Sequence, residues 1–235
     1  MKPEATASLA SIPSRRKLLK ITVASLLPQV GHLNVYLNGY EDVPEFLATD
    51  KITVARSQQH GDRGDAGKFF WASEVEGYHL VCDDDLIYPG RYAQSMIEAC
   101  KRYGRRAVVG LHGVTLRTPF VNYYSSRRVF HFSRSLSADQ HVHVLGTGTV
   151  CYHTNTIKVH PTDFRVPNMA DIWFALLGQR QQVPFVCAAH PSDWLCAQDT
   201  GKNNIFNKLR SGSAKDTAGI QTKTVKDNLP WEIYR

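Results

Sequence analysis

The sequence predicts an α/β fold in which helices flank a mostly parallel sheet. Short apolar strands alternate with amphipathic helices along most of the chain, an alternation typical of strand–helix–strand units. The chain has 235 residues, 43% of them hydrophobic, which is enough for one large domain with its own core. Three aspartates directly follow one apolar strand, and in such folds this end of a strand borders the ligand crevice.

The first half of the chain contains four of the expected strands, over residues 6–12, 32–37, 52–55 and 78–82. Residues 14–29 are expected to form a helix, because their apolar side chains recur at helical spacing. Ser14 can cap the start of this helix, and Pro28 marks its end. A second helix is expected over residues 66–76, with its aromatic side chains on the buried side.

The second half continues the pattern less regularly. Helices are expected over residues 89–103 and 169–181, and strands over residues 106–111, 142–145, 150–153 and 183–189. Residues 115–139 show no clean period and are expected to form a meander or a mobile segment. Residues 1–200 are therefore expected to form a single domain, and residues 201–235 a basic C-terminal tail that is only partly ordered.

The excess of basic residues limits the classes of partner. The chain carries 28 Lys and Arg against 21 Asp and Glu, a net charge of +7. Residues 201–235 contribute seven basic and three acidic side chains, and therefore four of the seven excess charges. No zinc-finger spacing, aromatic RNA-binding strand or recognition helix accompanies this charge, so a nucleic-acid partner is not expected. A phosphate-bearing substrate or an anionic membrane surface remains open.

Cysteine usage and hydropathy indicate a cytoplasmic protein. The five cysteines are scattered singly, which argues against a disulfide framework or a structural zinc site and indicates a reducing compartment. The N-terminus lacks the apolar core of a signal peptide, and no apolar run approaches the ~18 residues of a membrane-spanning helix. The basic tail remains compatible with peripheral contact on the inner face of an anionic membrane.

The feature that carries chemistry is Asp83-Asp84-Asp85, directly after the strand over residues 78–82. In open α/β sheets the carboxyl ends of the strands form the ligand crevice. Three adjacent carboxylates repel one another, but they become favourable when a hard divalent cation takes oxygen ligands from them. Mn²⁺ or Mg²⁺ would keep coordination positions for a diphosphate. The alternative is a solvated acidic turn or a helix cap.

In its context this triplet resembles a known motif. VCDDDLIYP resembles the DxD region of GT-A-fold glycosyltransferases, especially the family 2-like group. Other segments resemble parts of that fold in the same order: SLASIPSRRKLLKITVASLLPQV its first strand, nucleotide-binding loop and first helix; HLNVYLNGY its second strand; GDRGDAGKFFWA the stretch before the DxD strand; LGTGTVCYHTNTI the glycine-rich strand near the acceptor; and NMADIWFALLGQRQQVPFVCA the helix with the catalytic acid and the last strand. The resemblance covers about residues 5–195.

The resemblance implies a GT-A fold (Rossmann-like) and a metal-dependent glycosyltransferase of the hexosyltransferase type. Such an enzyme moves a sugar from a nucleoside-diphosphate donor to a glycan or lipid-linked acceptor. A UDP-sugar is the expected donor. Synthesis of a cell-envelope polysaccharide is the process that this implies. Asp83 and Asp85 would bind Mn²⁺ or Mg²⁺, and His190, beyond the last strand, would be a third ligand. Asp83 and Asp84 would also lie against the donor.

The resemblance makes Asp171, at the start of the helix over residues 169–181, the expected general base. The resemblance places a carboxylate here to deprotonate the acceptor hydroxyl, which implies an inverting single displacement. The family usually has a Glu-Asp pair, whereas this chain has Ala170 before Asp171. The helix macrodipole also favours an aspartate in the first turn, so a purely structural role stays open.

The remaining candidates would bind the donor and the acceptor. Besides Asp83 and Asp84, the donor-binding candidates are Ser11, Pro13, Ser14, Arg15, Asn38, Asp62, Arg63 and Lys68. Arg63 and Lys68 would contact phosphate as charge-assisted donors, and Asp62 could accept a uracil N–H. On the acceptor side, Gly148 would allow close approach of the backbone, and Trp194 would stack on a sugar. Loop, cap, bulge and core roles are the structural alternatives.

Two other functions remain open from the sequence. A sugar nucleotidyltransferase also combines such a sheet with Mg²⁺-binding carboxylates, but it requires a glycine-rich basic loop after the first strand. Residues 11–16 contain an arginine pair there and no glycine. A non-enzymatic module could use the basic tail alone to bind a polyanion or an anionic membrane.

Overall fold

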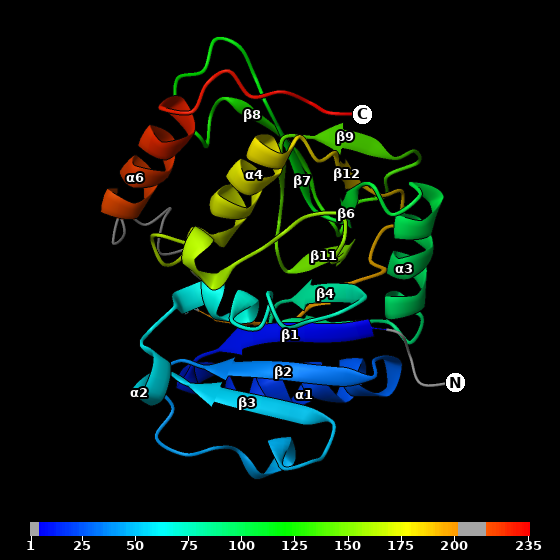
Figure 1. Cartoon of the computed structure of the whole chain (residues 1–235), viewed down its shortest axis with the longest axis vertical. Helices are drawn as coiled ribbons and strands as arrows, with labels where there is room; N and C mark the ends of the chain where they lie inside the picture. Colours follow the sequence, from blue (N-terminus) through cyan, green and yellow to red (C-terminus); the bar gives the residue numbers. More distant parts are fainter. Residues whose placement is uncertain (1–4, 202–214) are drawn as a thin grey trace.

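The computed structural model describes residues 5–201 and 215–235. Its centre is an eight-stranded sheet with the order β3-β2-β1-β4-β11-β6-β12-β9 (Figure 1). In that order the strands span Ile52–Arg56, His32–Leu37, Ala5–Ser11, Tyr78–Cys82, Thr149–His153, Val108–Gly110, Phe185–Cys187 and Gln140–Val142.

Most neighbouring strands of this sheet run parallel. β1 pairs with both β2 and β4, β2 pairs with β3, and β6 pairs with β12, all in parallel. β11 is antiparallel to β4 and β6, and β9 is antiparallel to β12 at one edge. The predicted α/β fold with a mostly parallel sheet is therefore confirmed.

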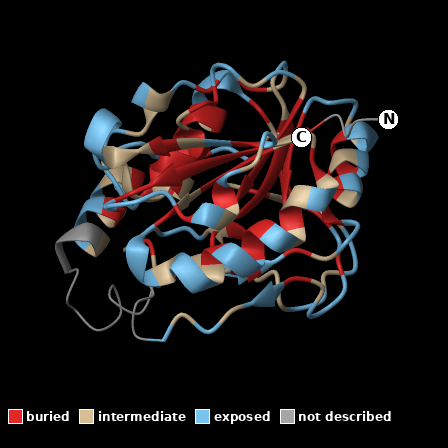
Figure 2. Ribbon diagram, turned by 90° about the horizontal axis from the view of Figure 1, so that it is seen from below, coloured by how far each residue is buried: buried red, intermediate tan, exposed pale blue. Residues whose placement is uncertain are grey.

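Helices cover both faces of the sheet. α1 (Arg16–Leu26) and α3 (Tyr92–Arg102) share one buried core with alternate residues of the central strands, whereas α4 (Ala170–Gln181) belongs to a second core. β4 divides its side chains between them, since Leu80 packs in the first core and Val81 in the second. Figure 2 shows the buried strands enclosed between partly exposed helices. The period of two along a strand is what sends successive side chains to opposite faces.

The first expected helix is α1, flanked by 3-10 turns over Pro13–Arg15 and Leu27–Gln29. The prediction that Ser14 caps this helix is wrong. Ser14 lies inside the first 3-10 turn, and the residue at the cap position, Arg15, makes no capping hydrogen bond with its side chain. The turn forms first because Pro13 favours the opening position of a helical turn.

The expected helix over residues 66–76 is also wrong. After a short helix α2 (Ser57–His60), the chain forms a 3-10 helix over Gly64–Phe69 and then a series of turns. A Cβ on Gly67 would lie 2.6 Å from the Tyr36 ring. The segment is thus pressed against β2, and this close contact overrides the local helical pattern.

Residues 115–139, which lack a clean period, include part of a small second sheet. β7 (Gly113–Leu116) pairs antiparallel with β8 (Arg127–Phe130) and with β10 (Val144–Leu145). A two-stranded sheet of β5 (Leu86–Ile87) and β13 (Cys196–Ala197) lies beyond the aspartate triplet.

The C-terminal segment includes a helix, α6 (Lys215–Lys226), which packs against the rest of the molecule (Figure 1). Val225 and Trp231 are buried, and Trp231 Nε1 donates to Val225 O at 3.1 Å. Residues 202–214 of the expected tail lie outside the described residues. Within the described ranges, no helix combines the length and hydropathy needed to cross a bilayer. All five cysteines are free thiols, and four of them are buried.

Candidate active site

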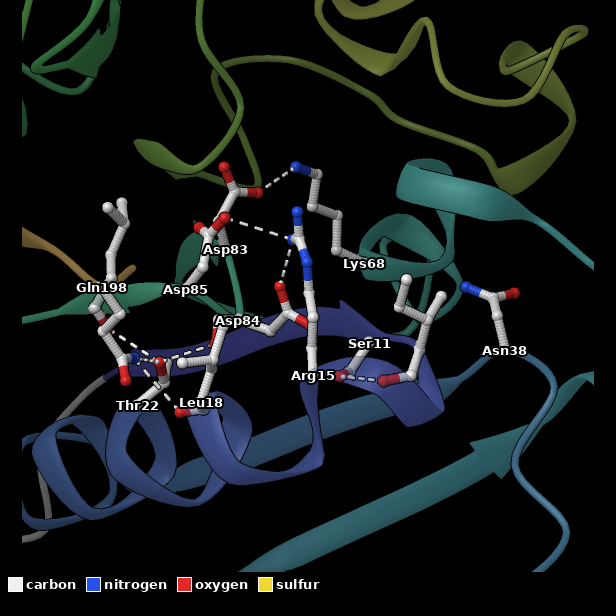
Figure 3. A network of polar contacts seen from close by, with 12 residues as sticks. Ser11, Arg15, Leu18, Thr22, Asn38, Lys68, Asp83, Asp84, Asp85 and Gln198 are labelled. Atoms are coloured by element: carbon white, nitrogen blue, oxygen red, sulfur yellow. Dashed lines mark hydrogen bonds and ion pairs between the residues drawn. The ribbon is translucent and has the colours of Figure 1, made fainter. Parts of the chain in front are cut away.

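The candidate active site lies where the strand order of the central sheet reverses. The chain proceeds from β1 to β2 and β3 on one side, and β4 then pairs with β1 on the other side. In open α/β sheets the crevice at the carboxyl ends of such strands is the usual ligand site. β1 ends at Ser11 and leads to Arg15, and β4 ends at Cys82 and leads to Asp83. Figure 3 shows the two strand ends and their polar side chains together.

Asp84 is the buried anchor of the acidic triplet. Its side chain is 3% exposed, and Arg15 Nη1 lies 2.7 Å from its Oδ1 and 3.2 Å from Asp85 Oδ2. Burial raises the pKa of Asp84, while the Arg15 guanidinium and a hydrogen bond with Ser11 oppose that shift. Thr22 Oγ1 also donates to the carbonyl oxygen of Asp84 at 2.9 Å. Asp84 therefore holds the loops after β1 and β4 together.

Lys68 occupies the centre of a group of carboxylates. Its Nζ lies 2.6 Å from Asp83 Oδ1, and its side chain is buried whereas that of Asp83 is 42% exposed. Burial acts to lower the pKa of Lys68, but the carboxylates of Asp83, Asp65 and Asp171 outweigh it and raise the pKa above the usual value. Lys68 is therefore a permanent positive charge that faces three acidic side chains.

Asp85 is the second accessible member of the triplet. Its side chain is 20% exposed. Burial, followed by the neighbouring Asp83 carboxylate, raises the pKa of Asp85 to about 6, although Arg15 opposes the shift. The backbone of Asp85 is fixed by Gln198, whose N–H donates to Asp85 O at 2.8 Å. A cation near Asp83 and Asp85 would relieve this repulsion between carboxylates.

Gly148 lies directly against the acidic triplet. A Cβ at this position would overlap the Asp83 carboxylate, so any larger residue here would displace that carboxylate. Tyr88 links the same two residues, because its Oη donates to Gly148 O at 2.7 Å and accepts from Asp83 N at 2.8 Å. The backbone of Gly148, in the loop that precedes β11, thus closely approaches Asp83. Its expected approach to an acceptor sugar stays a prediction.

Asp171 lies in the first turn of α4 and is held by Thr147. Asp171 Oδ1 accepts from both Thr147 N at 2.8 Å and Thr147 Oγ1 at 2.6 Å. Thr147 directly precedes Gly148, which lies against Asp83, so Asp171 is connected to the acidic triplet through this loop. The Asp171 carboxylate also raises the pKa values of Lys68 and Asp65.

Asp65 is a site residue that the sequence reasoning missed. Its Oδ2 accepts from Ala170 N at 3.0 Å, and its buried Oδ1 has no hydrogen-bond partner among the described residues. Burial raises the pKa of Asp65 to about 6, with Lys68 opposing and Asp171 adding to the shift. The available signal was a second aspartate in the glycine-containing segment over residues 61–67, three residues before Lys68.

Several donor-binding candidates form the neighbouring loops rather than contacting the triplet. Asn38 Nδ2 donates to Gly64 O at 2.9 Å, and its Oδ1 accepts from Arg63 N at 3.1 Å. Asp62 is exposed and its Oδ1 accepts from Gly64 N at 2.9 Å. The Arg63 guanidinium lies 5.1 Å from the centre of the Phe70 ring. Pro13 and Ser14 are likewise exposed, in the turn that follows β1. These loops lie beside the carboxyl ends of β1 and β2.

His190 and Trp194 lie on other elements. His190 exchanges backbone hydrogen bonds with Leu136, and its Nδ1 lies 2.7 Å from Ala188 O, while its buried Nε2 has no partner among the described residues. Trp194 packs against the α1/α3 core, 6.0 Å from Tyr92 between ring centres. Across residues 5–201 and 215–235, no three His, Cys, Asp or Glu side chains converge closely enough for a metal ion. A third protein ligand is thus a prediction that the geometry leaves untested.

Comparison with solved structures finds a partial likeness to a known enzyme. No family model matches the chain, and no curated protein matches it. Among solved structures, the chain is similar to glucosyl-3-phosphoglycerate synthase from Mycobacterium tuberculosis in complex with Mn²⁺, UDP-glucose and phosphoglyceric acid. The sequence identity is 14%, and the TM-score is 0.37. The likeness covers 46% of this chain and 43% of that protein, so the chain matches less than half of the synthase's length.

Proposed function

We propose that this protein is a metal-dependent glycosyltransferase that moves a sugar from a nucleoside-diphosphate donor to an acceptor hydroxyl. The observation that carries the proposal is the convergence of two accessible carboxylates, two fixed cations and a further aspartate at the switch point of the sheet. Asp83 and Asp85 come from the end of β4, and Arg15 and Lys68 are paired to the triplet. Asp171, at the start of α4, is bound by Thr147 in the loop whose Gly148 lies against Asp83. An anionic diphosphate and a divalent cation are complementary to this set.

The donor end of the site uses the triplet and its cations. Asp83 and Asp85 supply hard oxygen donors that fit Mn²⁺ or Mg²⁺, with diphosphate oxygens completing the ligand set. When bound, that ion would neutralise the charge that develops on the leaving diphosphate. Lys68 and Arg15 would then share their hydrogen bonds between the aspartates and the phosphate oxygens. The proposed nucleoside is uridine, and it would lie on the loops that carry Asn38 and Asp62.

The acceptor end of the site uses Asp171. Thr147 holds its Oδ1 with two hydrogen bonds, which leaves Oδ2 to accept the proton of the attacking hydroxyl. Attack on the anomeric carbon from this side would invert its configuration in a single displacement. Glycans and lipid-linked sugars of a cell-envelope polysaccharide are the proposed acceptors, and the cytoplasm or the inner face of the membrane is the proposed location.

Ligand binding to the whole chain tests the donor half of the proposal. In a thermal-shift screen of nucleotide sugars with and without Mn²⁺, we expect stabilisation by at least one donor that requires the metal, because a ligand bound to the folded state raises its apparent stability. Asp85→Asn should remove the metal-dependent part of the shift. Asp42→Asn is the matched control, since Asp42 is an exposed aspartate paired with Arg16.

Product analysis tests the reaction. Release of nucleoside diphosphate together with a glycosylated acceptor is expected, whereas release of pyrophosphate would identify a nucleotidyltransferase instead. Full transfer after exhaustive chelation would remove Asp83 and Asp85 from the role of metal ligands. Absence of any nucleotide-sugar binding would reject the transferase itself.

A further inference from the structure

We propose that Arg127 binds an anionic group of the acceptor, so that the acceptor carries a phosphate or carboxylate near the hydroxyl that receives the sugar. This inference rests on the proposed glycosyltransferase function and adds the chemical class of its acceptor. It stands on four observations: how Arg127 is held, which charges surround it, where it lies relative to Asp171, and what supports it from α6.

Arg127 is held between two aromatic rings. Its Cζ lies 4.7 Å from the ring centre of Tyr123 and 4.7 Å from that of Tyr124. Tyr123 is 5% exposed, and Arg127 itself is half-buried. Contact with aromatic faces restrains a guanidinium. The Tyr123 hydroxyl also hydrogen-bonds to Arg127, and the other N–H groups of the guanidinium can donate to an anion. The geometry is that of a preorganised fork for a planar or tetrahedral anion.

The surroundings of Arg127 contain little negative charge. Within the described ranges, no carboxylate lies within 4.0 Å of its guanidinium. Residues 99–138 contain eight Lys and Arg side chains and no Asp or Glu. A half-buried cation without a carboxylate partner has donors to offer to an incoming anion, and a neutral acceptor would leave that charge unpaired.

Arg127 lies within electrostatic range of the catalytic centre. Burial raises the pKa of Tyr123 most strongly, the Asp171 carboxylate raises it further, and Arg127 opposes both. Burial also raises the pKa of Tyr124, with Arg127 opposing the shift and Asp171 adding to it. The strand order gives the geometric link: β8, which begins at Arg127, pairs with β7, and β7 pairs with β10. β10 ends at Leu145, two residues before Thr147, which holds Asp171. An acceptor whose anionic group contacts Arg127 could thus extend its hydroxyl toward Asp171.

The C-terminal helix supports this arrangement. Tyr124 Oη donates to Gln221 Oε1 at 2.6 Å, and Tyr123 N donates to Thr222 Oγ1 at 3.2 Å. Tyr124 also borders a hollow of about 690 Å³ between its loop and α6, and Lys226 lines the same hollow.

The experiment compares three small probes that differ in charge. Wild-type protein saturated with UDP and Mn²⁺ is titrated calorimetrically with glycerol phosphate, with glycerate and with glycerol. We expect one or both anionic probes to bind at least about tenfold more tightly than glycerol, because charge-assisted hydrogen bonds exceed neutral ones. The comparison of glycerol phosphate with glycerate tells a phosphate site from a carboxylate site.

Variants then assign the site to Arg127. Arg127→Gln should weaken the anionic probe about 10- to 100-fold, and Arg127→Lys should have a smaller effect because it keeps the charge but loses the fork. Arg117→Gln removes the same charge from the exposed turn beside β7 and should leave affinity unchanged. Circular dichroism of each variant checks that the fold is retained.

The outcomes separate this inference from the proposed function. If glycerol binds as tightly as the anions, if neither anion binds, or if Arg127→Gln binds them like wild type, the acceptor inference is overturned. Binding of UDP with Mn²⁺ is measured first in the same samples. If the wild-type protein does not bind UDP with Mn²⁺, the proposed transferase function is rejected. Titration of the anions without UDP would still show whether Arg127 binds them.

Discussion

At the scale of single residues, the catalytic proposal depends on how Asp171 is held. Both hydrogen bonds to its Oδ1 come from Thr147, so the orientation of the carboxylate is set by a neighbouring loop. Asp171→Asn should lower kcat about 10²- to 10⁴-fold, since a positioned general base contributes that much. Binding of UDP and Mn²⁺ should not change. Turnover assays with the identified acceptor check this, and an Asp171→Asn enzyme with wild-type kcat would exclude Asp171 as the base.

Asp65 makes the stability of the folded protein depend on pH. Burial raises the pKa of Asp65 to about 6, against an ordinary value of 3.8. The folded state therefore keeps a proton that the unfolded chain releases, so this group lowers stability progressively as the pH rises from about 4 to about 6, and the loss is complete above that range. Asp85 shifts in the same direction.

Replacing Asp65 should therefore stabilise the protein at neutral pH. Asp65→Asn keeps an oxygen acceptor for Ala170 N and removes the buried charge, so we expect its free energy of unfolding at about pH 7.5 to exceed that of wild type by about 1–3 kcal/mol. The difference should vanish near pH 4. Urea unfolding across this pH range measures it, with the exposed Asp62→Asn as control. A constant difference at all pH values would contradict the linkage.

At the scale of elements, the C-terminal segment is attached through a few buried groups. Trp231 is 7% exposed, and Gln179 Nε2 from α4 donates to Glu232 O at 2.8 Å. Trp231→Ala should lower the free energy of unfolding by about 3–5 kcal/mol, as for other large core truncations. Ile233→Ala, at an exposed position of the same segment, should cost far less. Thermal or urea unfolding checks the pair, and equal effects would show that Trp231 contributes no specific packing.

At the scale of the whole molecule, the charge distribution predicts membrane affinity. The net charge is +7, and residues 201–235 account for four of these charges. Vesicles with anionic lipid should bind the protein in a salt-sensitive way, since each basic residue near such a surface contributes about 1 kcal/mol. Replacing Lys202, Lys208 and Arg210 by Gln should weaken this binding about 100-fold. Cosedimentation with anionic and zwitterionic vesicles measures it, and equal binding to both would exclude an electrostatic contact.

The local pattern of the chain was sufficient to predict the α/β class and much of the element order. Periodicity locates α1, α3, α4 and the four strands of the first half, because each buries one face or lies wholly inside the core. The same reasoning failed over residues 66–76, where Gly67 is pressed against Tyr36. That contact comes from β2, some 30 residues away in the chain, so no local window contains the cause.

The sequence by itself determined the position of the acidic triplet at the end of a buried strand and the candidacy of Asp171 and Lys68. Only the tertiary structure decided that Lys68 pairs with Asp83, that Asp84 is the buried anchor, and that Trp194 packs on the α1/α3 core. The physical reason is that ion pairs and burial depend on which loops meet at the edge of the sheet. Strand order sets those meetings, and strand order is not encoded in local periodicity.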